Sequence, residues 1–168
     1  MKILNISLLV LFSFFAISFA NAQEKPKSPP ETATGKINGA TIQINYGSPS
    51  VKGREIWGKL VPFNEVWRAG ANEATTFETD KALTIEGLIL PAGKYSFFII
   101  PNKDECTIIF NKETKQWGAY KYNDKVDQLR VKVKPQTADS FAEKLTYVIN
   151  ATDVELIWEK WIIGFNVK

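Results

Sequence analysis

Short runs of β-branched and aromatic residues, separated by turn-forming residues, recur along the chain after residue 35. In "ATIQINYG" the apolar Ile42, Ile44 and Tyr46 alternate with polar residues, which is the pattern of a half-buried strand. Residues 95–100 form an apolar run, which is typical of a central strand. The spacing of such runs predicts an all-β fold, an antiparallel β-sandwich of roughly eight to ten strands.

Residues 51–70 interrupt the strand pattern. Ile56 and Leu60 lie four positions apart, as on one face of a helix. Asn64 is placed to cap the start of a turn and Gly70 to end it. We therefore expect one or two short helical turns between residues 51 and 70, crossing an end of the sandwich.

Two turns are expected within the strand pattern itself. Glu86 and Gly87 interrupt "ALTIEGLIL" and favour a tight turn between two strands. The last apolar run, "VELIWEKWIIGFNV", is expected to form a hairpin that turns near Glu159 and Lys160.

The first 22 residues have the layout of a secretory signal peptide. Lys2 precedes an apolar run over residues 3–19, and the small-residue sequence Ala20-Asn21-Ala22 follows. A retained membrane anchor is the less favoured alternative, because the apolar run is barely long enough to span a bilayer and contains serines. We expect cleavage after Ala22 and an exported product, periplasmic or secreted, with no remaining membrane span.

The segment after the predicted cleavage point, residues 23–34, is expected to be a disordered leader. It holds three of the eight prolines and no large apolar side chain, so it cannot bury enough surface to offset its ordering entropy. The remaining residues, 35–168, have the length of a single domain with a sizeable core. The prediction is therefore one β-sandwich domain over residues 35–168.

Composition removes several classes of chemistry. The chain has no histidine, which excludes Ser-His and Cys-His nucleophile pairs and histidine metal ligands. It has one cysteine, Cys106, so it can form no internal disulfide. Asp124 and Asp127 lack the alternating oxygen ligands of a calcium loop. Because the lysines are scattered, no nucleic-acid partner is expected either, and we predict no cofactor and no metal.

A resemblance to a known family is carried by "YGSPSVKGREIWGKLVPFNEVWRAGANEATTF", "LPAGKYSFFIIPNKDECTIIFNK", "QWGAYKY" and "DQLRVKV". These stretches closely resemble domain of unknown function 2911, found in exported proteins of Gram-negative bacteria. The resemblance implies a β-rich exported domain and no established activity. Ser48 stands where the family usually has arginine, which leaves Arg54 as the cation of that segment. Cys106 stands where the family usually has tryptophan, which indicates a core-packing position.

The stretch "VWRAGANEAT", residues 66–75, concentrates polar and aromatic groups on one irregular segment. Arg68 and Glu73 can form a bidentate ion pair if a turn brings them together, and such a pair would pin the segment to the sheets. Exposed loop residues on a rigid scaffold often bind ligands, which is the alternative that we favour for function. The candidate ligand-binding residues are Arg54, Trp57, Trp67, Arg68, Asn72 and Glu73.

A second candidate surface comprises Trp117, Tyr120 and Tyr122, whose aromatic rings suit stacking against sugar rings. Together these features predict a noncatalytic module that binds a small ligand, a glycan or a partner protein of the cell envelope. One alternative is a hydrolase of a glycan or envelope polymer that uses Glu73 with Glu65 or Glu55 as acid and base. Another is a structural or assembly protein without a ligand site.

Overall fold

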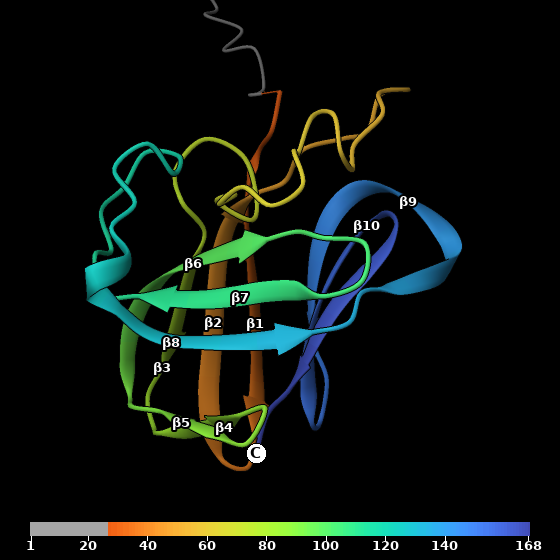
Figure 1. Ribbon diagram of the computed structural model, residues 1–168. Helices are drawn as coiled ribbons and strands as arrows, with labels where there is room; N and C mark the ends of the chain where they lie inside the picture. Colours follow the sequence, from red (N-terminus) through yellow and green to blue (C-terminus); the bar gives the residue numbers. More distant parts are fainter. Residues whose placement is uncertain (1–26) are drawn as a thin grey trace, which may run out of the picture.

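The computed structural model describes residues 27–168, in which the strands form three antiparallel sheets (Figure 1). The strands are β1 (Pro30–Ile37), β2 (Ala40–Gly47), β3 (Thr76–Thr79), β4 (Leu83–Ile85), β5 (Leu88–Leu90), β6 (Gly93–Ile100), β7 (Cys106–Asn111), β8 (Asp127–Val133), β9 (Gln136–Ile149) and β10 (Asp153–Asn166). A single turn of 3-10 helix, Asp124–Val126, precedes β8. The predicted all-β fold is confirmed. The predicted signal peptide, and residues 23–26 of the predicted leader, lie outside the described residues.

The largest sheet has six strands in the order β1-β2-β3-β6-β7-β8, and each neighbouring pair is antiparallel. Strand β6 lies inside this sheet and buries side chains on both faces, as its apolar run predicts. Strand β8 forms one edge, with Arg130 and Lys132 exposed. Strands β9 and β10 form a long hairpin, and β4 and β5 form a short one.

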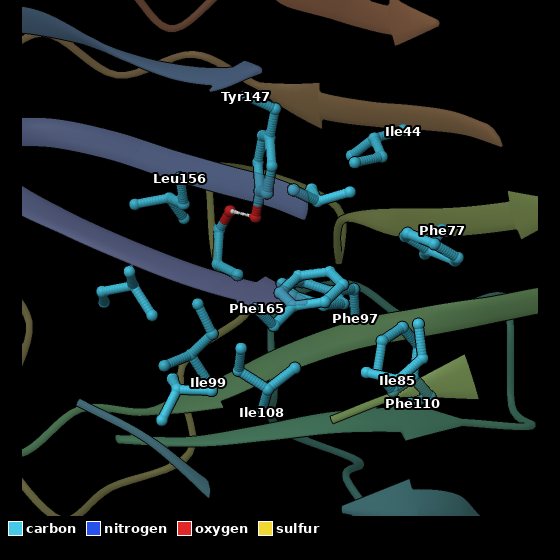
Figure 2. Packing of buried hydrophobic residues seen from close by; sticks show 14 of the residues in the cluster. Ile44, Phe77, Ile85, Phe97, Ile99, Ile108, Phe110, Tyr147, Leu156 and Phe165 are labelled. Carbon is cyan, nitrogen blue, oxygen red and sulfur yellow. Dashed lines mark hydrogen bonds between the residues drawn. The ribbon is translucent and has the colours of Figure 1, made fainter. Parts of the chain in front are cut away.

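The β9–β10 hairpin packs its inner face against the six-stranded sheet (Figures 1 and 2). Phe165 on β10 lies 5.9 Å from both Phe97 and Phe110 and 6.3 Å from Phe77, measured between ring centroids. The short β4–β5 hairpin contributes further buried side chains, and Ile85 bridges to Val167. The sheets therefore enclose one core in a sandwich-like arrangement.

Strand β1 begins at Pro30, so the predicted disordered leader is wrong for residues 30–34. The main chain of β1 pairs with β2 along its whole length, from Pro30 opposite Gly47 to Ile37 opposite Ala40. An edge strand of this kind is held largely by backbone hydrogen bonds, which hydropathy does not register. Because the prediction relied on large apolar side chains, it placed the start of the domain too late in the sequence.

The predicted helical turns between residues 51 and 70 are also wrong. This segment turns without forming a helix. Its internal backbone hydrogen bonds span three residues, as from the Lys59 amide to the Ile56 carbonyl, or five, as from the Val61 amide to the same carbonyl, and none has the four-residue spacing of an α-helix. Asn64 has a φ of 62°, which is left-handed and incompatible with a helix cap.

Of the two turns predicted within the strand pattern, the structure contains one. Glu86 and Gly87, with φ of 47° and 85°, join β4 to β5 as expected for a two-residue hairpin turn. The hairpin expected near Glu159 and Lys160 is wrong, because β10 continues through both residues. The register with β9 shifts on both sides of Glu159, whose φ is 58°, so the strand bends at a bulge and does not reverse.

Replacing Phe165 by alanine tests the packing between the hairpin and the six-stranded sheet. We expect Phe165→Ala to lower the free energy of unfolding by about 3–5 kcal/mol, because the cavity cannot collapse among three other rings. Denaturant unfolding measures the change. Phe141→Ala, at a side chain that is 52% exposed on β9, is the matched control and should change stability by less than about 0.5 kcal/mol. Equal losses in the two variants would contradict this packing.

Candidate functional site

The segment between β2 and β3 is anchored to the sheets by hydrogen bonds of its backbone. Trp67 and Ile99 exchange two of them, with N to O distances of 2.8 and 2.9 Å. The carbonyl of Ala69 accepts a hydrogen bond from the Tyr147 hydroxyl at 2.8 Å (dashed line in Figure 2) and another from the Thr75 hydroxyl at 3.0 Å. These contacts join the segment to β6 and β9 and place residues 66–75 at one end of the sandwich.

Small residues let this segment lie close to β2. A Cβ atom at Gly47 would stand 2.3 Å from the carbonyl oxygen of Ala71, and one at Gly70 would stand 3.0 Å from the carbonyl oxygen of Gly47. Ala69 and Asn72 adopt left-handed φ values of 53° and 66°. The sequence "AGAN" therefore forms a tight, irregular turn against the end of β2.

The predicted ion pair between Arg68 and Glu73 does not form; neither residue makes an ion pair within residues 27–168. The left-handed residues Ala69 and Asn72 turn the chain between them. Arg68 and Glu73 consequently line different grooves. Arg54, also a predicted site residue, lines neither groove, and its guanidinium donates to the carbonyls of Val51 and Ser50 within its own turn.

The predicted site tryptophans Trp57 and Trp67 belong to an aromatic cluster with the β10 residues Trp158 and Trp161. Trp57 stacks on Trp161 with ring centroids 4.6 Å apart, and Trp67 stacks on Trp158 at 6.0 Å. Trp57 and Trp67 meet edge to face at 5.7 Å. These indoles pack the segment onto the hairpin, so they do not form an open stacking platform.

The first groove, called here the Trp117 groove, has a volume of about 550 Å³. It lies among the ends of β1 and β2, the turn around Asn72, and the loop that follows β7. Its lining residues are Ser28, Pro30, Glu31, Thr32, Asn45, Tyr46, Gly47, Ala71, Asn72, Glu73, Ala74, Thr76, Lys94, Thr114 and Trp117. It thus combines Asn72 and Glu73 of the first predicted site with Trp117 of the second.

Glu73 and Trp117 are brought together by a short antiparallel pairing. The Ala74 amide donates to the Gln116 carbonyl at 2.9 Å, and the Gly118 amide donates to the Asn72 carbonyl at 3.1 Å. Residues directly opposite one another in an antiparallel pair project their side chains to the same face. Both side chains are exposed, and Trp117 retains 63% of its accessible surface.

Polar atoms line the rest of the Trp117 groove. The Thr32 hydroxyl donates to Asn45 Oδ1 at 2.8 Å, and Asn72 Nδ2 donates to the Ser28 carbonyl at 3.2 Å. Thr76 Oγ1 is buried and has no hydrogen-bond partner within residues 27–168. The sequence analysis did not predict that residues of β1 and β2 line this groove. The polar positions that alternate with apolar ones in "ATIQINYG" could have indicated that one face of β2 is open to a ligand.

The second groove, called here the Arg68 groove, has a volume of about 370 Å³. Its lining residues are Leu60, Pro62, Glu65, Val66, Trp67, Arg68, Ala119 and Tyr120. It shares no lining residue with the Trp117 groove. Arg68 and Trp67 of the first predicted site therefore meet Tyr120 of the second in this groove.

Tyr122, the remaining predicted surface residue, is half-buried and packs edge to face on Phe98 at 5.1 Å. Its hydroxyl donates to Asp127 Oδ2 at 2.5 Å and accepts from Arg130 Nη2 at 2.5 Å. Burial, followed by the hydrogen bond to Asp127, raises the pKa of Tyr122 above its ordinary value. Tyr122 therefore holds the loop after β7 against β8 and lines neither groove.

Comparison with protein families confirms the resemblance seen in the sequence. A family model described as "Protein of unknown function (DUF2911)" matches residues 28–167. No curated protein and no solved structure gave a significant match. Within residues 27–168, no helix has the length and apolar character needed to cross a bilayer. The same residues contain no group of three or more acidic, cysteine or histidine side chains suited to a metal ion.

Replacing Tyr147 by phenylalanine tests how the segment is anchored. The Ala69 carbonyl keeps its bond from Thr75, so we expect Tyr147→Phe to lower the free energy of unfolding by only about 0.5–1.5 kcal/mol at neutral pH. The control is Tyr120→Phe at a side chain that is 84% exposed, where denaturant unfolding should show a change below about 0.5 kcal/mol.

Tyr147→Phe should also differ from the wild type in the pH dependence of its stability at alkaline pH. Burial raises the pKa of Tyr147 well above its ordinary value, so the folded state holds the neutral phenol. This contribution to stability is present below about pH 10 and is lost as the pH rises further, because the unfolded chain ionises first. Tyr147→Phe should therefore lose less stability above that pH than the wild type, whereas an identical alkaline slope in both would contradict the burial of this phenol.

Proposed function

The chain belongs to the DUF2911 family of proteins of unknown function, and we propose that it is an exported, noncatalytic module that binds a neutral glycan in the Trp117 groove. The proposal rests on one observation above the others. An exposed tryptophan stands opposite an exposed carboxylate at a groove whose size suits a few sugar rings.

The exposure of Trp117 supports a stacking role. Trp57 and Trp67, by contrast, cover part of their apolar surface by packing on each other and against the core. Trp117 is left 63% exposed on a backbone that its pairing with Glu73 holds in place. The axial C–H groups of a pyranose carry a small positive charge and fit the negative face of an indole. A fixed, exposed indole therefore favours a sugar ring as its occupant.

The polar atoms around Trp117 suit hydroxyl groups. The exposed Glu73 carboxylate is an acceptor, and the side-chain amide of Asn72 has a second N–H group besides the one that it donates to the Ser28 carbonyl. Thr76 also lines the groove, but its hydroxyl oxygen is buried and is not among the polar groups that a ligand would meet. A small number of placed polar groups beside one apolar wall is the usual composition of a small-ligand site.

The charges of the Trp117 groove favour a neutral glycan over an acidic one. Glu31 and Glu73 both line the groove and are exposed. Lys94 is the only cation among the lining residues, and it is already engaged by Glu78 at 3.5 Å. A further anion that entered this groove would be repelled by these two carboxylates, whereas hydroxyl groups would find acceptors.

The alternative function as a hydrolase has less support. Glu65 lines the Arg68 groove, and Glu55 lines neither groove, so neither predicted partner shares a groove with Glu73. Glu31 does share it, but acid and base roles require one carboxyl group to be shielded from water. Because both carboxylates of the Trp117 groove are exposed, they suit ligand binding better than acid and base catalysis.

Binding of chitohexaose and cellohexaose, measured by calorimetry, tests this function. We expect Trp117→Ala to weaken binding of the preferred hexasaccharide by about tenfold or more, because the stacking surface is lost, while Trp117→Phe retains part of the affinity. Phe141→Ala, at an exposed aromatic residue that lines neither groove, should bind as the wild type does. An oligomer of galacturonate should bind more weakly than the neutral sugars.

Two outcomes would count against the proposal. Equal binding by wild type and Trp117→Ala, with both proteins folded, would remove the Trp117 groove as the site. Shortened oligosaccharides after prolonged incubation with the wild type, and not with Glu73→Gln, would replace the binding module by a hydrolase.

Export is tested by producing the full chain in a Gram-negative host and separating the cell fractions. We expect the product in the periplasm or the medium, with Gln23 as its first residue by intact mass, because Ala20-Asn21-Ala22 ends the predicted signal peptide. Replacing Ala20 and Ala22 by leucine should block cleavage. A full-length product that stays in the cytoplasm would contradict export.

A further inference from the structure

Arg68 is a half-buried cation that makes no ion pair and no side-chain hydrogen bond within residues 27–168. Its Nε is buried. A buried donor without a hydrogen-bond partner, such as this Nε, destabilises the folded state. Groups kept at a cost to stability are common at binding sites.

The guanidinium of Arg68 lies near Gly118. Gly118 has a φ of 66°, and a Cβ atom there would stand 3.7 Å from Arg68 Nη1 and 2.9 Å from Tyr120 Cε2. The Gly118 amide is fixed by its hydrogen bond to the Asn72 carbonyl. The guanidinium and the Tyr120 ring therefore lie on the same side of the Gly118 backbone, where a side chain at position 118 would meet both.

Apart from Arg68 and Glu65, the residues that line the Arg68 groove have apolar or aromatic side chains. Leu60 and Tyr120 are 45% and 84% exposed, and Pro62 and Val66 add further apolar surface to its walls. Glu65 is the one acidic side chain that lines the groove. The groove thus offers one cation, one anion and an apolar surface in a volume of about 370 Å³, which suits a small ligand.

We propose that the Arg68 groove binds a small organic acid that carries one carboxylate and a compact aromatic body. The planar guanidinium matches a carboxylate through two parallel hydrogen bonds, and Leu60 and Tyr120 would cover the aromatic body. Glu65 disfavours a ligand with a second negative charge. This site goes beyond the glycan function, because its lining residues are entirely different from those of the Trp117 groove.

Phenylacetate and its uncharged analogue phenylacetamide are the probes, and backbone amide NMR spectra of the labelled protein are the readout. We expect phenylacetate to produce saturable shifts at Trp67, Ala119 and Tyr120, with an affinity about tenfold or more above that of phenylacetamide, because only the acid pairs with the guanidinium. Phenylmalonate, which carries two carboxylates, should bind more weakly than phenylacetate.

Three variants test the roles of Arg68 and Glu65 in this groove. Arg68→Met should weaken phenylacetate binding by about tenfold or more while keeping the unfolding midpoint unchanged or raised, because it keeps the apolar stem and removes the buried unpartnered donor. Arg54→Met is the matched control, since Arg54 is an arginine of the same segment that bonds only within its own turn, and it should bind phenylacetate normally. Glu65→Gln should improve the binding of phenylmalonate.

The proposal is overturned if phenylacetamide binds as well as phenylacetate, if Arg68→Met binds normally, or if no saturable shifts occur at the Arg68 groove. The comparison of acid with amide uses the wild type alone, so it decides the matter even if Arg68→Met does not fold. Trp117→Ala should leave phenylacetate binding unchanged, which keeps failure of this site distinct from failure of the glycan site.

Discussion

Residues 48–75 contain no strand, so their buried peptide groups must find hydrogen-bond partners on other elements. The Trp67 backbone pairs with Ile99 on β6, the Ala69 carbonyl receives two hydroxyl groups, and the Ala71 amide donates to the Gly47 carbonyl. Each such group left unpaired would cost about 1–3 kcal/mol. This requirement fixes the path of the segment, and the positions of both grooves depend on that path.

The loop after β7 completes both grooves because it pairs with the same segment. Glu73 lies opposite Trp117, and Gly118 bonds to Asn72 and packs against the guanidinium of Arg68. A few neighbouring residues of one loop thus present an indole to one groove and a phenol to the other. Sites built in this way, on loops held by a rigid scaffold, are common in β-sandwich proteins.

Aromatic side chains divide into two populations with different physical roles. The rings of β3, β6, β7 and β10 form the core, and four tryptophans join the irregular segment to β10. Trp117 and Tyr120 are exposed and pack less against the core. Residue type alone does not separate the two populations, because burial depends on which elements face each ring.

The sequence by itself determined the all-β fold, the central position of β6, the turn at Glu86 and Gly87, and the family, because period-2 patterns and turn chemistry are local properties. It also identified Asn72, Glu73, Arg68, Trp117 and Tyr120 as candidate site residues. Only the tertiary structure decided how they combine, separating Arg68 from Glu73 and joining Glu73 to Trp117. Left-handed residues and backbone pairing between distant loops set that arrangement, and neither leaves a periodic signal along the chain.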